Sequence, residues 1–312
     1  MKNINIKKAV SWIGTALMLV SLVFIALQIW NMRGDIDFST LSSPFVIAAL
    51  LIVALAEGFV MILNSLNYRI ILSSLTSIFV KPFQVVKVYT TANLYKYIPG
   101  GIMYVVGRNR LAVDIPELSH GKVALSTVVE GVLWAVAGII ISATYAFNHS
   151  LYYIRQLNVM PMLGIVVAAL VLLIVVVAIC FRHRLSKLFS EKFSITHFRF
   201  GVAIKLLFSM FMLKNLWAAT FIAVLMVLGQ PMTIGLAITL MGLYILSWTA
   251  GFLTPGAPSG LGIREFVLLM FMGGTINDDI LLSAIVIHRA LQVAGDIIAY
   301  VMVIGYGKIK GN

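Results

Sequence analysis

The chain has 312 residues, of which 61% are hydrophobic and 11% are charged, and its mean hydropathy is +1.03. Soluble domains carry about 25% charged residues, so this composition excludes a water-soluble protein and predicts an all-α, polytopic membrane protein. We attribute the formal net charge of +12 to basic loops that face anionic lipid headgroups, rather than to nucleic-acid binding.

About 20 apolar residues are needed for a helix to cross a bilayer, and eight stretches approach that length. We expect spans over 9–30, 44–66, 121–147, 160–181, 202–229, 232–254, 259–276 and 279–307. The first of these is longer than a signal-peptide core and is expected to be a retained anchor. The stretch 259–276 is the shortest, and it either crosses as a short helix or enters the membrane and returns.

The stretch 70–107 is interrupted by Lys81-Pro82 and predicts a re-entrant or interfacial hairpin rather than two full spans. Basic residues then set the orientation. They concentrate before residue 9, in 67–122, in 182–205 and after 307, and eight crossings place all four segments on one side. This distribution predicts a protein of the cytoplasmic membrane with both termini in the cytoplasm.

A short motif occurs twice, and in both copies an arginine follows the proline of a Pro-Gly pair by nine residues. The residues concerned are Lys96, Pro99, Gly100, Gly101 and Arg108 in the first copy, and Pro255, Gly256, Gly260, Gly262 and Arg264 in the second. Proline and glycine interrupt helices, and broken backbone at membrane depth is tolerated where it is buried or lines a wet cavity. The motifs predict broken helices at a transport site, and an internal repeat around 82–147 and 240–307 within one membrane domain covering 1–312.

Ionisable side chains within the apolar stretches predict where a polar headgroup would bind, because such groups are costly in a membrane and usually pair or face water. We expect Arg108, Arg264 and Arg289 to contact phosphate, since a guanidinium grips two phosphate oxygens at once. Glu130 and Glu265 would pair with these arginines in the empty cavity or contact a cationic headgroup.

A second set of polar residues is assigned a supporting place in this cavity: Glu57, Lys214, His288, Gln292 and Asp296. The last three are spaced by four and should share one helix face. For Glu57 and Lys214 a purely structural pairing is an equal alternative. The five tryptophans are scattered along the sequence and suggest at most interfacial anchors.

Catalytic signatures are missing from the sequence: it has no nucleophile elbow, P-loop, dinucleotide fingerprint or HExxH motif. The single cysteine, Cys180, excludes an intrachain disulfide. We therefore expect no catalytic residue, metal or cofactor, and a transporter rather than an enzyme.

The motif residues also resemble a known family. Lys96 to Gly101, continuing to Arg108, is similar to the R-Y-L-P-G block of the lysylphosphatidylglycerol synthase transmembrane region, and Pro255 to Glu265 is similar to its P-G-G-L-G-V-R-E block. Glu130 and Arg289 fall where that family carries a glutamate and an arginine. The resemblance implies a flippase-like membrane domain, here without the soluble synthase domain. The chain departs from the family at Ala257-Pro258-Ser259.

The leading hypothesis from the sequence is a translocase that moves a phospholipid or lipid-linked headgroup between leaflets. Expected partners are anionic or aminoacylated phospholipids or a polyprenyl-phosphate-linked sugar, but not nucleic acid, with a homo-oligomer or a lipid-modifying enzyme left open. The alternatives are an integral-membrane glycosyltransferase, for which Asp114 and Glu117 are candidate carboxylates, and an accessory protein in lipid-linked glycan or surface-polysaccharide assembly.

Overall fold

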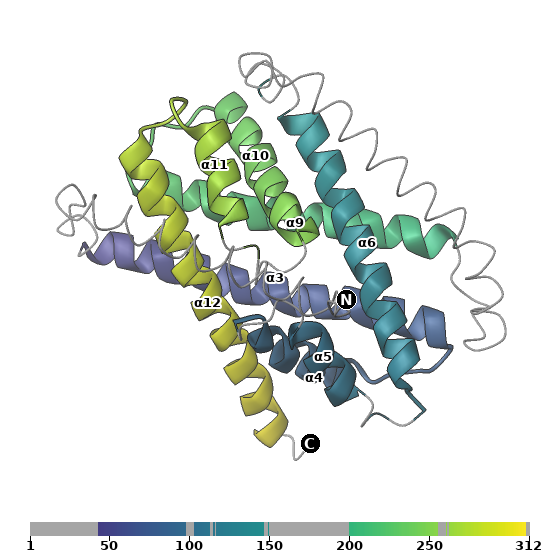
Figure 1. The fold of residues 1–312 in the computed structure, drawn as a ribbon. Coiled ribbons are helices and arrows are strands. Elements are labelled where there is room, and N and C mark those ends of the chain that lie inside the picture. The colour runs from purple at the N-terminus through teal and green to yellow at the C-terminus, as the bar shows by residue number, and fades with distance from the viewer. Residues whose placement is uncertain are drawn as a thin grey trace, which may run out of the picture.

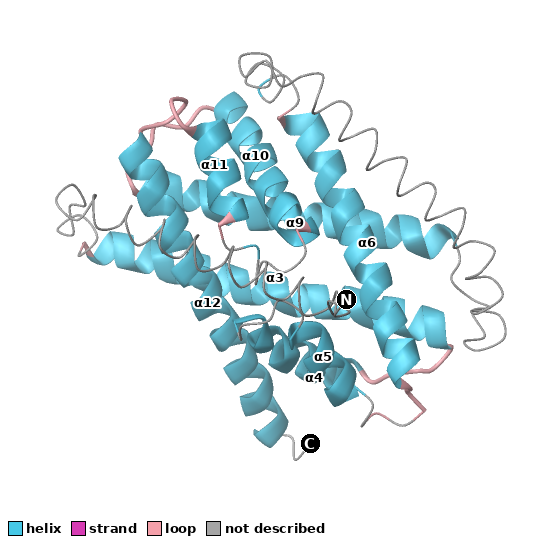
Figure 2. Ribbon diagram, viewed as in Figure 1, coloured by secondary structure: helices cyan, strands magenta, loops and turns pink. Residues whose placement is uncertain are grey.

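The computed structural model describes residues 43–97, 103–112, 115, 117–146, 149, 200–254, 260 and 262–309. All regular structure in these ranges is helical, apart from an isolated bridge between Gly273 and Ile276 (Figure 2). The helices are α3 (Pro44–Thr76), α4 (Pro82–Leu94), η1 (Tyr95–Tyr97), α5 (Met103–Ala112), α6 (His120–Tyr145), α9 (Phe200–Val227), α10 (Ile234–Leu253), α11 (Ile263–Met272) and α12 (Asp278–Ile309). Five of them, namely α3, α6, α9, α10 and α12, are long and apolar enough to cross a membrane. The chain is an all-α polytopic membrane protein, as its composition predicts.

The long helices match the spans expected from hydropathy. The ranges 121–147, 202–229, 232–254 and 279–307 correspond to α6, α9, α10 and α12. The range 44–66 begins correctly but α3 continues to Thr76, where Ser77 in the left-handed conformation ends it. The expected spans 9–30 and 160–181 lie outside the described residues.

A hairpin is present where one was expected over 70–107, but its helices α4 and α5 span 82–112, and residues 70–76 belong to α3 instead. The two hairpin helices have 13 and 10 residues and pack against each other. At about 1.5 Å per residue they measure roughly 20 and 15 Å, less than the roughly 30 Å hydrocarbon core. The hairpin starts at Pro82, which suits the first turn of a helix because it has no amide hydrogen to leave unbonded.

A second hairpin is formed by α10 and the short helix α11, which follow each other in the chain with an interruption between them. Ten-residue α11 is too short to cross alone, and it runs back beside α10 (Figure 1). Of the two alternatives for 259–276, the returning segment is therefore the one that fits. The ranges 82–145 and 234–309 thus share one element order: a helix, an interruption, a ten-residue helix and a long helix.

Each of these hairpins rests on the long helix of the other half. The rings of Phe83 and Tyr306 lie 5.7 Å apart, and Asn93 donates to Asp296 at 3.0 Å, so α4 runs antiparallel to α12 and ends near its middle. Similarly, α10 runs antiparallel to α6 and ends near its middle, where Gly131 faces Phe252. Figure 1 shows the two hairpins at opposite ends of the bundle, with α4 and α5 near the end of α12 and α10 and α11 near its start.

The centre of the bundle is the crossing of α3 and α12, which is closed by two glycines. A Cβ atom built on Gly295 would lie 2.8 Å from the carbonyl oxygen of Ala54 and 2.9 Å from the nitrogen of Gly58. Only residues without side chains let two backbones approach this closely. The crossing brings the polar face of α12 against Glu57 of α3.

Candidate functional site: a polar cavity between two hairpins

A cavity of about 390 Å³ lies where the tips of the two hairpins meet. Its wall includes Tyr97 and Tyr104, which lie on either side of the Pro-Gly pair of the first motif, and Thr254 and Gly260, which lie on either side of that of the second. The described residues on both sides of each Pro-Gly pair therefore lie at this cavity. The motif residues Pro99, Gly100, Gly101, Pro255 and Gly256 themselves lie outside the described residues.

Most residues expected to form the site are brought together here. The predicted residues on the cavity wall are Glu57, Lys96, Arg108, Glu130, Gly260, Arg264, Arg289, Gln292 and Asp296. Glu265 and His288 line a small neighbouring cavity that shares Arg264 and Arg289. Apart from Gly260, these residues come from five helices and the 3₁₀ turn, and they are up to 239 positions apart in the sequence.

The motif arginine of the first half is held by Glu130. Arg108 is 2% exposed and donates to one oxygen of Glu130, while the Tyr89 hydroxyl donates to the other at 2.8 Å. The guanidinium carbon also lies 4.5 and 4.2 Å from the ring centres of Tyr68 and Tyr89. The expected pairing of Arg108 with Glu130 is thus present. The tyrosines were not expected, since nothing in their spacing links them to Arg108.

In the second half, Glu265 connects the start of α11 to α12. One carboxylate oxygen accepts the backbone N–H of Gly262 at 2.6 Å, and the other accepts from Arg289 at 2.8 Å. Gly262 has a φ of 83°, which allows the chain to turn directly into the helix. The expected pairing of Glu265 with an arginine is present, and it also caps α11.

Arg264, the motif arginine of the second half, has no carboxylate partner among the described residues. It is 8% exposed, and its single polar contact with a described residue is a 3.4 Å bond to the hydroxyl of Tyr244. Its stem runs past two glycines: a Cβ on Gly251 would lie 2.6 Å from Cγ, and one on Gly260 would lie 2.9 Å from Cδ. Gly260 also has a φ of 67°. The local backbone therefore makes room for a cavity-facing guanidinium that no carboxylate in the described part of the chain neutralises.

Asp296 fastens the tip of the first hairpin to α12. It accepts from Asn93 at 3.0 Å, from the Tyr97 hydroxyl at 2.5 Å and from Lys96 at 2.5 Å. The Lys96 and Arg289 side chains are 28% and 23% exposed, so they mark the more open part of the cavity.

Glu57 pairs with His288 rather than with Lys214. Its carboxylate lies 3.1 Å from His288 Nε2 and accepts from the Thr220 hydroxyl at 2.6 Å. Farther along the same face of α12, Gln292 donates to the Tyr244 hydroxyl at 2.8 Å. The face shared by His288, Gln292 and Asp296 is thus turned to the interior, as their spacing predicts.

Lys214 is fully buried beside the cavity. Its Nζ lies 4.1 and 4.2 Å from the ring centres of Trp134 and Trp248 and has no hydrogen-bond partner among the described residues. Trp134, Trp217 and Trp248 all line the cavity, with ring centres 5.1–6.0 Å apart. The expectation that the tryptophans are scattered and serve at most as interfacial anchors was wrong for these three. They are far apart in the sequence but meet where α6, α9 and α10 pack.

No family model matches this chain, and no curated protein sequence matches it either. The family resemblance accordingly remains a proposal that depends on the two motif blocks.

Proposed function

We propose that this protein is a lipid translocase that moves an anionic phospholipid or a lipid-linked phosphate headgroup between membrane leaflets. The observation that carries the proposal is Arg264, a buried guanidinium on the wall of a central cavity with no acidic partner among the described residues. A buried charge without a counter-ion is strongly unfavourable, so its retention at this position favours an anionic ligand.

The surroundings of the cavity support an amphipathic ligand. The outer faces of the long helices are apolar, with Phe59, Phe208 and Val301 more than half exposed. A headgroup can then contact Arg264 while its acyl or prenyl chains remain in lipid. The resemblance of the two motif blocks to the lysylphosphatidylglycerol synthase transmembrane region agrees with this class of function.

The same arrangement is compatible with location in the cytoplasmic membrane and cytoplasmic termini. If α10 and α11 enter and leave on one side, the eight expected crossings become six, and an even number keeps all basic segments on the same face. The α4–α5 and α10–α11 hairpins would then enter from opposite faces, an arrangement typical of transporters built from inverted repeats.

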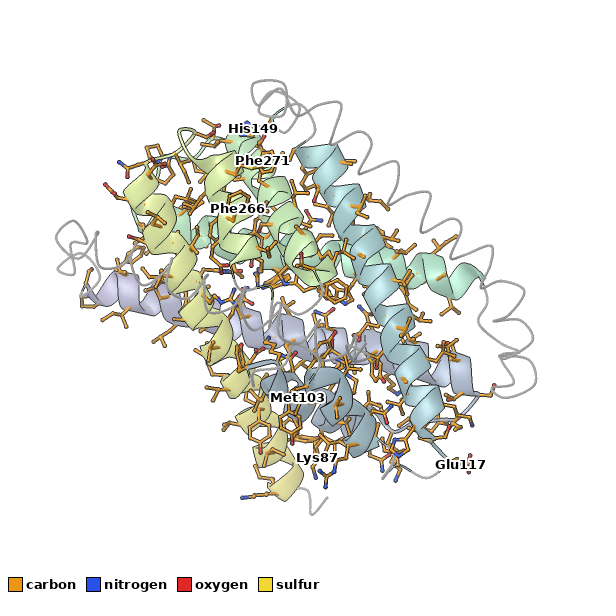
Figure 3. All side chains as sticks on the ribbon, viewed as in Figure 1. Lys87, Met103, Glu117, His149, Phe266 and Phe271 are labelled. Carbon is orange, nitrogen blue, oxygen red and sulfur yellow. The ribbon has the colours of Figure 1, made fainter. Side chains whose placement is uncertain are left out.

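The glycosyltransferase and accessory-protein alternatives gain no support from the described residues. Glu117 is exposed in the connection between α5 and α6, at the periphery of the molecule (Figure 3), and Asp114 lies outside the described residues. We therefore propose translocation alone.

The test is a leaflet-exchange assay in liposomes with fluorescent phosphatidylglycerol and fluorescent polyprenyl phosphate. We expect wild-type protein to accelerate exchange and Arg264→Gln to slow it about 10- to 100-fold, the range for losing a hydrogen-bonded charge. Arg110→Gln is the matched control, because Arg110 is exposed on α5 and should not affect exchange. Wild-type exchange no faster than in protein-free liposomes would refute the proposal, as would full activity of a folded Arg264→Gln variant.

A further inference from the structure

A buried carboxylate and a buried imidazole meet where α3 crosses α12. Glu57 and His288 are 7% and 3% exposed, and Oε1 of the carboxylate lies 3.1 Å from Nε2 of the ring. Ionisable side chains at membrane depth are costly, and they mark proton relays in pumps and transporters. An imidazole is also the side chain whose charge ordinarily changes between pH 5 and 8, so this pair is a candidate site for a proton.

Thr220 gives the pair a hydrogen-bond arrangement for each protonation state. Its hydroxyl oxygen lies 2.6 Å from Glu57 Oε1, 2.9 Å from His288 Nε2 and 2.5 Å from the carbonyl oxygen of Trp217. A hydroxyl has one hydrogen and donates to one atom at a time. With the proton bound, the ring N–H donates to the carboxylate and the hydroxyl donates to Trp217. With the proton released, the ring N–H donates to the hydroxyl, which in turn donates to Glu57.

The pair lies beside Arg264, the guanidinium proposed to bind the anionic headgroup. Glu57 shares the wall of the central cavity with Arg264, and His288 shares the small neighbouring cavity with it. Tyr244 lies between them: its hydroxyl accepts from Arg264 at 3.4 Å, and its ring centre is 5.3 Å from that of His288. A change of charge on the pair therefore changes the electrostatic potential where the headgroup would bind.

The other charged side chains on these two cavity walls are matched in pairs within the described residues. The pairs are Arg108 with Glu130, Arg289 with Glu265, and Lys96 with Asp296. The walls also carry tyrosines, but a phenol ordinarily titrates near pH 10. Lys214 is fully buried between the Trp134 and Trp248 rings and lies on neither wall. Among the described wall residues, the Glu57–His288 pair is thus the group that ordinarily changes charge near neutral pH.

A proton on this pair and an anion at Arg264 favour each other. The pair is neutral overall with its proton and carries one negative charge without it. In the empty cavity that negative charge offsets Arg264, which has no carboxylate partner among the described residues. A bound anion takes over this role, so the pair then favours its proton, and by linkage the proton strengthens anion binding equally. At a separation of roughly 10 Å and an effective dielectric constant of about 20, one unit charge changes the affinity for a monoanion by about tenfold.

We propose that the Glu57–His288 pair binds one proton together with the anionic headgroup, so that the protein is a proton–lipid symporter. The proton comes from the aqueous phase, is held by the carboxylate and the imidazole, and returns to water when the headgroup leaves. A proton and a monoanionic headgroup cross together without net charge, so the membrane potential does not drive or oppose the step. This inference rests on the proposed function and adds a driving force to it.

The first test is isothermal titration calorimetry of the full chain in detergent with short-chain phosphatidylglycerol. This phosphodiester stays monoanionic from pH 5.5 to pH 8, because it lacks the second ionisation of a phosphomonoester near pH 6. We expect its affinity for the wild-type protein to rise about tenfold from pH 8 to pH 5.5. Titrations at pH 7 in buffers of different ionisation enthalpy should show a net uptake of protons on binding.

Two substitutions assign the effect to the pair. His288→Gln removes the imidazole and keeps a donor beside Glu57, so the affinity should no longer depend on pH and the proton uptake should vanish. Glu57→Gln removes the carboxylate that stabilises an imidazolium and should have the same result. His120→Gln is the matched control, because His120 is exposed at the start of α6 and its loss should leave the wild-type pH profile unchanged.

The second test imposes a pH gradient on liposomes that contain a trace of fluorescent phosphatidylglycerol. Symport stops when the lipid gradient balances the proton gradient. A difference of one pH unit should therefore enrich the lipid up to about tenfold in the leaflet that faces the more alkaline compartment. Protein-free liposomes and liposomes with His288→Gln should show no enrichment.

The outcomes separate proton coupling from translocation. Fast exchange with a pH-independent affinity and no enrichment would overturn the inference and leave the translocase proposal standing. Proton-linked binding without exchange in liposomes would support the proton site and refute translocation. Enrichment by a folded His288→Gln variant would overturn the assignment to this pair. If neither variant of the pair folds, a flat wild-type pH profile still overturns the inference, and no binding or exchange at any pH refutes both proposals.

Discussion

The substitution Gly295→Ala tests whether the crossing of α3 and α12 is as tight as the structure requires. The added Cβ would lie 2.6 Å from Cβ of Glu57, 2.8 Å from the carbonyl oxygen of Ala54 and 2.9 Å from the nitrogen of Gly58. Two of these three atoms belong to backbone and cannot rotate away. The helices must therefore separate, and that movement also disturbs the 3.1 Å contact between Glu57 and His288.

The magnitude follows from two opposing effects. Overpacking costs about 1–3 kcal/mol, whereas replacing a helical glycine by alanine gains about 0.8–1 kcal/mol. The net effect of Gly295→Ala is a loss of up to about 2 kcal/mol. Gly305 is the matched control on the same helix, since no atom lies within 4 Å of its built Cβ. Gly305→Ala should therefore keep the gain of about 0.8–1 kcal/mol.

The measurement is reversible unfolding in mixed detergent micelles, followed by the loss of helical circular dichroism. We expect the free energies of unfolding of the two variants to differ by about 1–3 kcal/mol, with Gly295→Ala the less stable. An equal gain in stability for both variants would refute the close approach of α3 to α12. Slower lipid exchange by Gly295→Ala, with unchanged exchange by Gly305→Ala, would link the crossing to the cavity.

Three further substitutions test the contacts of the cavity. Glu130→Gln should lower the free energy of unfolding in micelles by about 3–5 kcal/mol, because it leaves buried Arg108 without its counter-ion. The double variant Glu130→Gln/Arg108→Met should recover most of that loss. Additive losses from the two substitutions would contradict the ion pair. Glu265→Gln should lower the free energy of unfolding by less, about 1–2 kcal/mol, because its partner Arg289 is partly exposed. A loss as large as that of Glu130→Gln would contradict this ranking. Gly260→Ala should slow lipid exchange for two reasons. A residue other than glycine at φ 67° is strained by about 1–2 kcal/mol, and the added Cβ would displace the aliphatic part of the Arg264 side chain. Exchange at the wild-type rate would show that this position of the Arg264 side chain is not required.

Hydropathy and membrane-buried charge account for the parts of the structure that the sequence predicts. Apolar length locates the long helices because the bilayer imposes it on every span. The pairing of Glu130 and Glu265 with arginines is also predictable, since a charge at membrane depth needs a partner. The end of α3 was predicted at residue 66, ten residues before its observed end at Thr76. Polar Asn67 and Arg69 indicated a loop there, although Asn67 is buried within the helix.

Contacts between distant parts of the sequence were not predictable. Glu57 pairs with His288 because α3 and α12 cross at glycines, and nothing in either segment encodes that crossing. Lys214 was expected to have an acidic partner or a functional role, and its enclosure by Trp134 and Trp248 depends on how α6, α9 and α10 pack. Such placements require the tertiary structure, because side-chain type alone does not choose among buried partners.

The attachment of the first hairpin to α12 has a consequence for biosynthesis. Asn93 and Tyr97 find their acceptor, Asp296, about 200 residues later in the chain. At about 5–20 residues per second, a ribosome needs roughly 10–40 s to cover that distance. During this interval the hairpin tip is in the nascent protein without the helix that completes it. Assembly of the cavity is therefore a late event, and a chain arrested before α12 would present an unfinished tip to the quality-control proteases of the membrane.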